Sequence, residues 1–531
     1  MKTPKPSDLG LDHDEWRPGQ WDAVKFTNGL RAGEIGIIEA PTGSGKTGIV
    51  SASSITRPTV ALMNTRNEQR QFGRYDFDIL FGKANYSCSH EDAAPYATAN
   101  DCLHKDEGMN KCSFANSCAY LLARDAAMAS KHAALNYALW ARFWPGNWPA
   151  PDLMVMDEGH DLPALVRERA GVVITQEMRD QYQFGQPPLL AVRKDGITWS
   201  AADSDNTPLS RALTYLFSTI RPLESAIDTY ERNSKQATSR KELQAAQSLL
   251  MNVKTCIAAI EMSQSDWFVE CLPANNWQFT VKPLTARHHF QRMMVPQSAA
   301  TMIMSGTIGN FDVFADELGI HTFQRHTVPS VWEPRARPVY DLCTPQMGMK
   351  ADESDKEEQA KRIADVIRAC DRTWNGIVLT TSKVAAAELA RRLTRKGLGD
   401  RVYVANEKLG TDRRVVEWQE QMKRKPGSIN VSWDMWQAYD GVQEKTLVVA
   451  KAPFGSLGSE YDQQRMRYSG ALYAWEAAQK LAQGIGRTRR GNPEDYDTPT
   501  EKRGMVAIAD NGWLRLKKYI PQHVLLSILP W

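Results

Sequence analysis

The sequence predicts an α/β protein with two parallel-sheet domains, the first of them interrupted by two inserts. Short apolar runs of strand length recur along the 531 residues, each followed by a turn and a stretch compatible with a helix. Such alternation is typical of parallel sheets that helices cover on both faces. A chain of this length also exceeds what one hydrophobic core can organise. The apolar runs lie at 35–40, 153–156, 300–304, 376–380, 401–405, 429–433, 447–450 and 505–509.

These runs fall into two groups, which separates the domains. Runs up to residue 304 belong to the first domain and those after about residue 335 to the second. The insert at 74–127 contains four crowded cysteines. The insert at 163–283 contains two stretches with helical spacing of Leu, Ile and Ala, at 210–232 and 239–262, joined by a polar link. The second insert therefore predicts a helical hairpin.

Composition and charge limit the possible partners. Lys and Arg number 65 against 62 Asp and Glu, a formal net charge of +3. Any basic surface for nucleic acid would therefore be a local stripe. No apolar stretch approaches the roughly 20 residues that span a bilayer, and the polar start does not resemble a signal peptide. We expect a cytoplasmic, nucleoid-associated protein without a membrane partner.

A Gly-rich segment follows the first apolar run. Residues 40–47 read Ala-Pro-Thr-Gly-Ser-Gly-Lys-Thr, between a strand-like run and helix-compatible sequence, which is the context that a phosphate-binding loop requires. Glycines let backbone N–H groups approach phosphates at a helix N-terminus. Lys46 is expected to contact the β- and γ-phosphates of ATP, and the Thr47 hydroxyl to ligate Mg²⁺. The rest of the predicted cradle is Thr42, Gly43, Ser44 and Gly45.

An acidic pair ends the second apolar run. Asp157 and Glu158 directly follow residues 153–156. Taken alone, such a pair is often only a helix N-cap. Downstream of a phosphate loop it instead predicts that Asp157 holds Mg²⁺ and that Glu158 orients and deprotonates the attacking water.

An arginine-rich segment lies in the second domain. Residues 483–490 read Gln-Gly-Ile-Gly-Arg-Thr-Arg-Arg. Arg487 and Arg490 are three residues apart, so both can face one side of a helix. An isolated basic run is usually a solvated surface. Paired with the two motifs above, it predicts arginines that stabilise charge on the γ-phosphate from across a cleft.

The crowded cysteines predict a metal centre. Cys88, Cys102, Cys112 and Cys118 are separated by 13, 9 and 5 residues. Four thiolates from one segment can hold either an iron–sulfur cluster or zinc, and the spacing alone leaves both open.

Candidate nucleic-acid contacts follow two strand-like runs. Hydroxyls and amides at 65–69 and 380–383 could bind phosphates without selecting bases. Several aromatic side chains could stack on bases, with packing in the core as the alternative for each. These aromatic candidates are Tyr86, Trp140, Phe143 and Trp144.

Over nearly its whole length the chain resembles the XPD/DinG helicases. Residues 157–160, Asp-Glu-Gly-His, are similar to the family's Asp-Glu-Ala-His box, with Gly159 in place of alanine. Cys88 and Cys118 lie in contexts that resemble those of the first and last cluster ligands. Shorter segments are similar as well: Arg17-Pro18-Gly19-Gln20, Asn136-Tyr137 and Ser305-Gly306-Thr307. The family's last motif is matched by Gln483, Gly486, Arg487 and Arg490, and its C-terminal pattern by Asp510, 517–519 and 525–530. Residues 433–442, with Asp440, resemble a further family motif more loosely.

The resemblance implies two RecA-like P-loop NTPase domains, with an iron–sulfur insert and a helical arch inserted into the first. It implies a 4Fe–4S cluster on the four cysteines, Gln20 beside Arg17 as the adenine contact, and His160 and Gln483 as members of the catalytic site. It also implies ATP-dependent 5′-to-3′ movement on single-stranded DNA and opening of forked duplexes, by a protein that we expect to be monomeric. The implied first domain comprises 1–73, 128–162 and 284–335, with the cluster insert at 74–127, the arch at 163–283 and the second domain at 336–531.

Two alternatives remain. One is an RNA helicase or remodeller of the same superfamily, against which the cysteine insert argues. The other is a nucleotide-gated recruitment module that does not unwind, against which the presence of Lys46, Glu158 and Arg487 argues.

Overall fold

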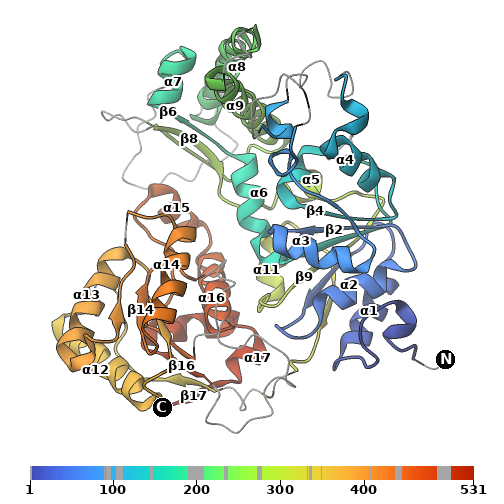
Figure 1. Ribbon diagram of the computed structural model, residues 1–531. Helices are drawn as coiled ribbons and strands as arrows, with labels where there is room; N and C mark the ends of the chain where they lie inside the picture. Colours follow the sequence, from blue (N-terminus) through green and yellow to red (C-terminus); the bar gives the residue numbers. More distant parts are fainter. Residues whose placement is uncertain are drawn as a thin grey trace.

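Two parallel sheets organise the molecule (Figure 1). The structure, a computed structural model, describes residues 3–88, 90, 97–102, 112–143, 148–188, 208–232, 237–271, 278–331, 333, 338–348, 350–406, 408–436, 445–486 and 504–531. Each of the two sheets has seven strands, and a third, antiparallel sheet has three. The two seven-stranded sheets fit the expected pair of RecA-like domains.

The first sheet has the strand order β10-β1-β9-β5-β2-β4-β3, and all its pairs are parallel. Side chains on both of its faces are buried: Ile37 and Ile38, neighbours on β1, are fully buried in different hydrophobic clusters. This explains the unbroken apolar run in the sequence. The strands are β1 Ile35–Glu39, β2 Thr59–Met63, β3 Asp78–Leu80, β4 His132–Asn136, β5 Leu153–Asp157, β9 Ala300–Ser305 and β10 Gln324–Thr327.

The second sheet has the order β13-β14-β12-β15-β16-β11-β17 and is also parallel throughout. The apolar run predicted at 401–405 is a strand only at Val402 and Tyr403. The strands are β11 Val339–Asp341, β12 Gly376–Leu379, β13 Val402–Tyr403, β14 Ile429–Ser432, β15 Thr446–Val449, β16 Met505–Ile508 and β17 Ile528–Pro530.

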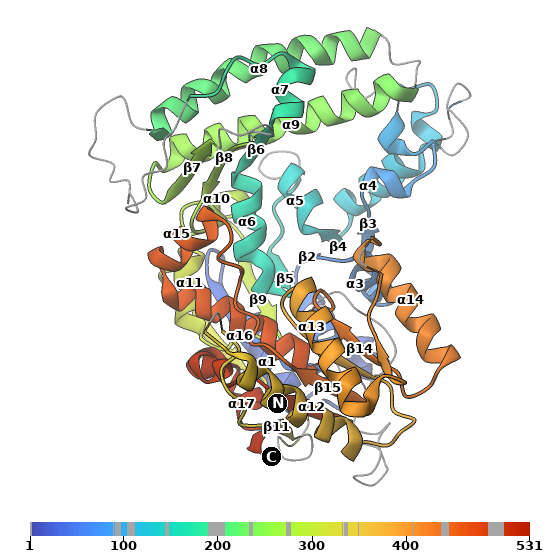
Figure 2. The same ribbon diagram turned by 90° about the vertical axis from the view of Figure 1, so that its left-hand side faces the viewer.

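Helices cover both sheets on both faces (Figures 1 and 2). No helix within the described ranges is both long enough and apolar enough to cross a membrane. The helices are α1 Gln20–Gly29, α2 Lys46–Ser54, α3 Arg66–Phe72, α4 Ala119–Ala129, α5 Tyr137–Phe143, α6 Leu162–Ala170, α7 Gln176–Tyr182, α8 Pro208–Arg232, α9 Ala237–Met262, α10 Phe290–Met294, α11 Phe311–Glu317, α12 Glu353–Ala369, α13 Lys383–Leu393, α14 Thr411–Arg424, α15 Glu460–Tyr468, α16 Gly470–Gly486 and α17 Gln522–Leu525.

The predicted helical hairpin is confirmed as the pair α8 and α9. Its base was not predicted: β6 (Val172–Thr175), β7 (Trp267–Cys271) and β8 (Gln278–Pro283) form an antiparallel sheet in the order β6-β8-β7. In Figure 2 the hairpin extends from this sheet on one side to the cysteine insert on the other. There, Asn100 Nδ2 donates to Gln244 Oε1 at 2.8 Å, and Gln244 Nε2 donates to Asn100 O at 2.9 Å.

The two RecA-like domains share one hydrophobic cluster, which contains residues from both sheets. Helix α16 of the second domain packs on α11 of the first, where the Trp475 and Phe314 ring centroids are 5.5 Å apart. The Trp475 indole N–H also donates to the carbonyl oxygen of Ile308 at 2.8 Å. The domain contact therefore lies next to the Ser-Gly-Thr segment that ends β9.

Candidate active site

The Gly-rich loop connects β1 to α2 at the carboxyl edge of the first sheet. Gly45 has φ +77°, a left-handed conformation that favours glycine, and a Cβ there would lie 2.6 Å from Gln20 Nε2. Gln20 Nε2 donates to Gly45 O at 3.2 Å, and the Arg17 guanidinium donates to Gly43 O. The structure thus places Arg17 and Gln20 directly against the loop. Their predicted adenine contact stays a prediction.

Lys46 is the first residue of α2 and forms an ion pair with Glu158, which follows β5. Burial alone would lower the pKa of Lys46, but the Glu158 and Asp157 carboxylates outweigh it and hold that pKa above its usual value. Burial likewise opposes the charged form of Glu158, yet Lys46 keeps the pKa of its carboxyl well below the usual range. Both groups are therefore charged at neutral pH.

Asp157 ends β5 and is buried. Its Oδ1 accepts the backbone N–H of Glu158 at 2.9 Å, and its carbonyl oxygen accepts the Tyr137 hydroxyl at 2.6 Å. Burial raises the pKa of Asp157 well above its usual range, although Lys46 opposes this. A cation stabilises the ionised form of such a carboxylate, so the position suits a Mg²⁺ partner.

His160, which follows β5, contacts β9 of the first domain and α16 of the second. Its Nδ1 lies 2.8 Å from Ser305 Oγ, at the end of β9, and its Nε2 contacts the Gln483 side chain on α16. Burial opposes protonation of the ring, but Asp161 and Glu158 raise the pKa of His160. Residues predicted from separate motifs are thus brought together: Lys46 contacts Glu158, which lies beside His160, and His160 contacts Gln483.

The Ser-Gly-Thr segment approaches the phosphate loop closely. A Cβ on Gly306 would lie 3.4 Å from Ala40 O and 3.9 Å from Lys46 Nζ, so the backbone itself faces the loop. The Thr307 backbone N–H donates to Ser305 Oγ at 3.1 Å. Arg487 and Arg490, the predicted second-domain arginines, lie outside the described residues, as does Asp440.

The four cysteines of the first insert are half-buried thiols. Cys88 lies next to the antiparallel Ser87–Thr98 bridge, Cys102 follows the short 3-10 helix Ala99–Asp101, and Cys118 is the N-cap residue of α4. Cys102 and Cys118 pack against the same hydrophobic cluster. In the described part of the chain, no three Cys, His, Asp or Glu side chains converge as a metal site. The cluster therefore stays a prediction.

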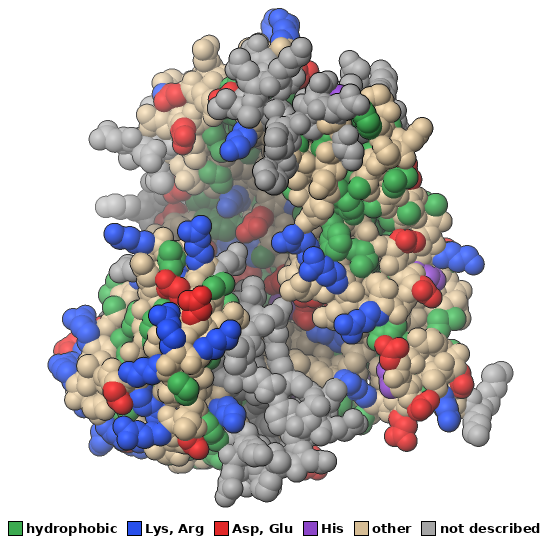
Figure 3. Space-filling view, viewed as in Figure 1, with side chains coloured by type: hydrophobic (Ala, Val, Ile, Leu, Met, Phe, Trp, Pro, Cys, Tyr) green, Lys and Arg blue, Asp and Glu red, His purple; other side chains and the backbone are tan. Residues whose placement is uncertain are grey.

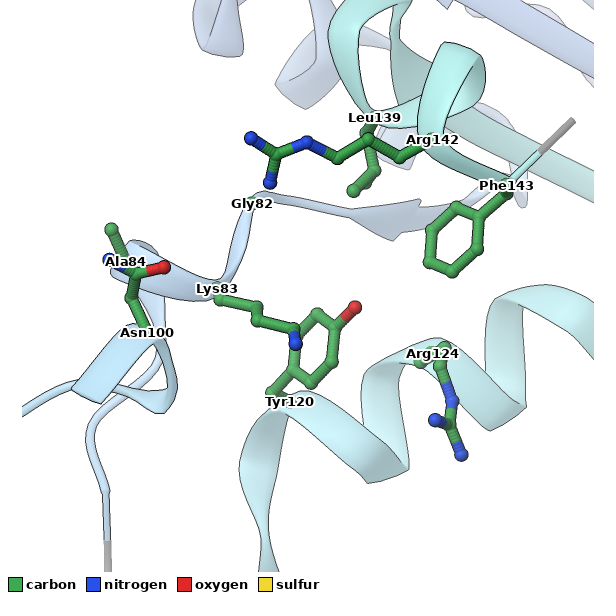
Figure 4. Close-up of a pocket in the computed structure, with 9 residues that line it drawn as sticks. All are labelled: Gly82, Lys83, Ala84, Asn100, Tyr120, Arg124, Leu139, Arg142 and Phe143. Atoms are coloured by element: carbon green, nitrogen blue, oxygen red, sulfur yellow. The ribbon is translucent and has the colours of Figure 1, made fainter. Parts of the chain in front are cut away.

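A pocket of about 460 Å³ lies between the cysteine insert and the first domain. Figure 4 shows Lys83, Arg124 and Arg142 around it with the Tyr120 and Phe143 rings. The Lys83 ammonium lies 5.5 Å from the centre of the Tyr120 ring. The remaining lining residues are Gly82, Ala84, Asn100 and Leu139.

The other nucleic-acid candidates have mixed outcomes. Trp140 is fully buried and donates to Met294 O at 2.9 Å, so it packs in the core. The Tyr86 hydroxyl accepts the Phe81 N–H at 3.1 Å, and Trp144 lies outside the described residues. The side chains of Thr65 and Ser382 act as N-caps of α3 and α13.

Comparison with known proteins gives structural matches only. No family model and no curated protein matches the sequence. A structure titled XPD helicase aligns with a TM-score of 0.59 and 14% identity, covering 98% of this chain and 100% of its own. An apo XPD structure gives 0.54 and 13%, covering 94% and 97%, and Xpd4 of S. tokodaii gives 0.52 and 12%, covering 97% and 99%. The fold is that of the XPD helicases.

Within this XPD-like fold, the sequence did not reveal the buried charges at the domain contact. Arg167 on α6 forms ion pairs with Glu317 of the first domain and Glu476 of the second, and Arg465 also pairs with Glu476. The sequence shows only one charged residue at each position, Arg167 on α6 and Glu476 on α16. Their pairing spans 309 residues of sequence and is visible only once the domains are packed.

Proposed function

We propose that the protein is an ATP-driven motor that moves 5′ to 3′ along single-stranded DNA and separates the strands of forked duplexes. The observation that carries the proposal is the meeting of two domains at one site. Lys46, Glu158 and His160 come from the first domain, and Gln483 reaches His160 from the second. Hydrolysis at such a site can change how the two domains sit together, which is what stepping along a strand requires. The XPD-like fold supports the same activity.

The residues present suit ATP hydrolysis. The loop N–H groups and Lys46 would bind the β- and γ-phosphates, with Thr47 and Asp157 placed to hold Mg²⁺, which supplies positive charge to the phosphates. A water attacks the γ-phosphorus as its bond to the β,γ-bridging oxygen breaks, and Glu158 accepts the proton of that water. His160 would pass the change at the phosphate to Gln483. Arg487 and Arg490 are proposed to stabilise charge on the γ-phosphate.

Single-stranded DNA is the proposed partner. Lys83 and Arg142 supply positive charge to the pocket beside the cysteine insert, where Arg124 is paired with Asp125, and Tyr120 and Phe143 offer ring faces for stacking. Figure 3 shows further Lys and Arg side chains gathered over the second domain in the region of α12, α13 and α14. These contacts are to phosphates and ring faces, so we propose no sequence preference. We place the protein, as a monomer, at the nucleoid.

We propose that Cys88, Cys102, Cys112 and Cys118 hold a 4Fe–4S cluster. Four half-buried thiols within one short insert are a suitable donor set, and the apolar packing of Cys102 and Cys118 shields such a group from water. The purified protein should be brown, with broad visible absorption and stoichiometric iron and sulfide, and the colour should bleach in Cys102→Ser. Stoichiometric zinc without iron would contradict the cluster and favour the zinc alternative.

The test of the motor is strand separation on forked DNA carrying either a 5′ or a 3′ single-stranded tail, with and without ATP. We expect opening only of the 5′-tailed fork, only with ATP, and none by Lys46→Ala. Lys25→Ala, which removes an exposed lysine paired with Asp22, is the matched control and should behave as wild type. Stimulation of the ATPase by RNA alone would support the RNA alternative. An ATPase rate unchanged by Lys46→Ala would support the recruitment module.

A further inference from the structure

Helix α16 presents one polar stripe to the first domain. Glu476, Gln479 and Gln483 are spaced by three and four residues, so they share one face of the helix. Gln483 contacts His160, Gln479 Nε2 donates to Ile308 O at 3.2 Å, and Glu476 Oε1 accepts the Arg167 guanidinium at 2.8 Å. The stripe thus touches the acidic box, the Ser-Gly-Thr segment and α6.

The Gln483–His160 and Glu476–Arg167 contacts have the same spacing along both segments. His160 precedes Arg167 by seven residues, in the turn that leads directly into α6, and Glu476 precedes Gln483 by seven residues on α16. Seven helical residues rise about 10 Å. The two segments therefore run antiparallel, and these two contacts between them lie about two turns apart. Gln479 and Trp475 of α16 contact Ile308 instead, which lies outside the 160–167 segment. Two separated contacts fix the register of one helix against another, whereas one contact permits pivoting.

The contact away from the ATP site is a cluster of four charged side chains, two of them buried. Arg167 and Glu317 are among the buried charged residues of the chain, and Arg465 Nη2 lies 2.7 Å from Glu476 Oε1. Burial alone would raise the pKa of Glu476, but Arg167 and Arg465 hold it below its usual value, so Glu476 stays ionised. Burial raises the pKa of Glu317 to about 7, although Arg167 and Arg465 oppose this. Two cations therefore face Glu476 and a second carboxyl, Glu317, that is only partly ionised at neutral pH, and this partial balance makes burial of the charges tolerable.

We propose that the Arg167–Glu476 contact positions α16, so that Gln483 meets His160 in the register that hydrolysis requires. Arg167 and Glu476 are positioning residues: neither touches the ATP site, and both act through α16. The inference rests on the proposed ATPase activity, and it adds two residues outside the sequence motifs that link the position of α16 to that activity. Loss of the contact leaves the phosphate loop intact but lets α16 pivot about its remaining contacts.

The test compares Glu476→Gln, Arg167→Gln and the double variant with wild type in DNA-stimulated ATP hydrolysis. Glu476→Gln is isosteric and changes a partly exposed side chain, so it should fold. Arg467→Gln is the matched control, because it breaks an exposed ion pair with Glu460 within α15. We expect each single variant to lose about tenfold in kcat while its KM for ATP stays within about twofold, a coupling of ordinary size. The double variant should be no worse than the poorer single variant, because both changes remove the same ion pair between the domains.

Three results would overturn the proposal. One is a loss of kcat in the double variant equal to the product of the two single losses. The others are a rise in KM without a fall in kcat, and a wild-type rate for Glu476→Gln. A second measurement is independent of catalysis. Small-angle scattering should give a larger radius of gyration for Glu476→Gln than for wild type and Arg467→Gln, and equal radii would overturn the positioning role. If wild type itself lacks ATPase activity, the proposed function fails, and the scattering comparison still decides whether this contact holds the domains together.

Discussion

Replacing Glu158 by Gln isolates the chemical step from ATP binding. Glu158 has φ +50°, lies beside His160 and pairs with Lys46, and glutamine keeps its size and its hydrogen-bonding oxygen. What glutamine lacks is the ability to accept the proton of the attacking water. A positioned general base contributes about 100- to 10,000-fold, so kcat should fall by that factor, equivalent to about 3–5 kcal/mol of barrier. ATP affinity should hold or improve, because Lys46 loses the carboxylate that competes with the phosphates.

The assay is single-turnover hydrolysis with labelled ATP, together with equilibrium binding of a fluorescent ATP analogue. Glu168→Gln is the matched control, since Glu168 lies on the same segment but is exposed, and it should hydrolyse ATP at the wild-type rate. A hydrolysis rate for Glu158→Gln within about threefold of wild type would refute the role of Glu158 as base, because a threefold loss is far smaller than the loss expected when a general base is removed. Loss of ATP binding would refute the view that Glu158 competes with the phosphates for Lys46.

Three further outcomes follow from the structure. Gln20→Ala should raise the KM for ATP more than it lowers kcat, because Gln20 contacts the loop and not the reacting atoms; steady-state kinetics at varied ATP checks this. Trp140→Ala should destabilise the first domain by about 3–5 kcal/mol, seen as a lower urea midpoint, because it empties a fully buried site. Burial lowers the pKa of His289 to about 4, below the value of about 6.5 in the unfolded chain. The stability that the neutral ring contributes is therefore complete above pH 6.5 and decreases as the pH falls, with a loss of about 3 kcal/mol at pH 4. Urea unfolding of wild type against His289→Phe at pH 7 and pH 4 measures that difference.

The sequence revealed the sheets and the first-domain half of the site because both depend on local patterns. An unbroken apolar run such as 153–156 is the direct result of a strand buried on both faces, and a glycine at a left-handed position such as Gly45 is required wherever a loop turns so tightly. The contact of Lys46 with Glu158 also follows from topology, because the carboxyl ends of parallel strands meet at one edge.

The sequence did not reveal what arises only from packing between distant elements. The base of the hairpin is a three-stranded sheet in which β6 (Val172–Thr175) is separated from β7 (Trp267–Cys271) and β8 (Gln278–Pro283) by the whole hairpin, and β6 alone is too short to be distinguished from a loop. The stacking candidate Trp140 is a core residue because of its contact with Met294, which no local pattern shows. The ion pair between Arg167 and Glu476 likewise depends on how the two complete domains pack together.

The way in which the charges at the domain contact are shared would allow the two domains of the proposed motor to separate and rejoin. Removing one partner from a buried ion pair ordinarily leaves an uncompensated charge, which is strongly unfavourable. Here each side of the domain contact keeps a counter-ion of its own: Glu317 stays with Arg167 in the first domain, and Arg465 stays with Glu476 in the second. Opening therefore breaks the Arg167–Glu476 contact without leaving either charge alone. The same division is found at the candidate active site, where Glu158 balances Lys46 within one domain and the His160–Gln483 hydrogen bond is the contact that joins the two domains. These two polar contacts between the domains thus use interactions that can be broken at low cost, which the proposed motor would require in every cycle.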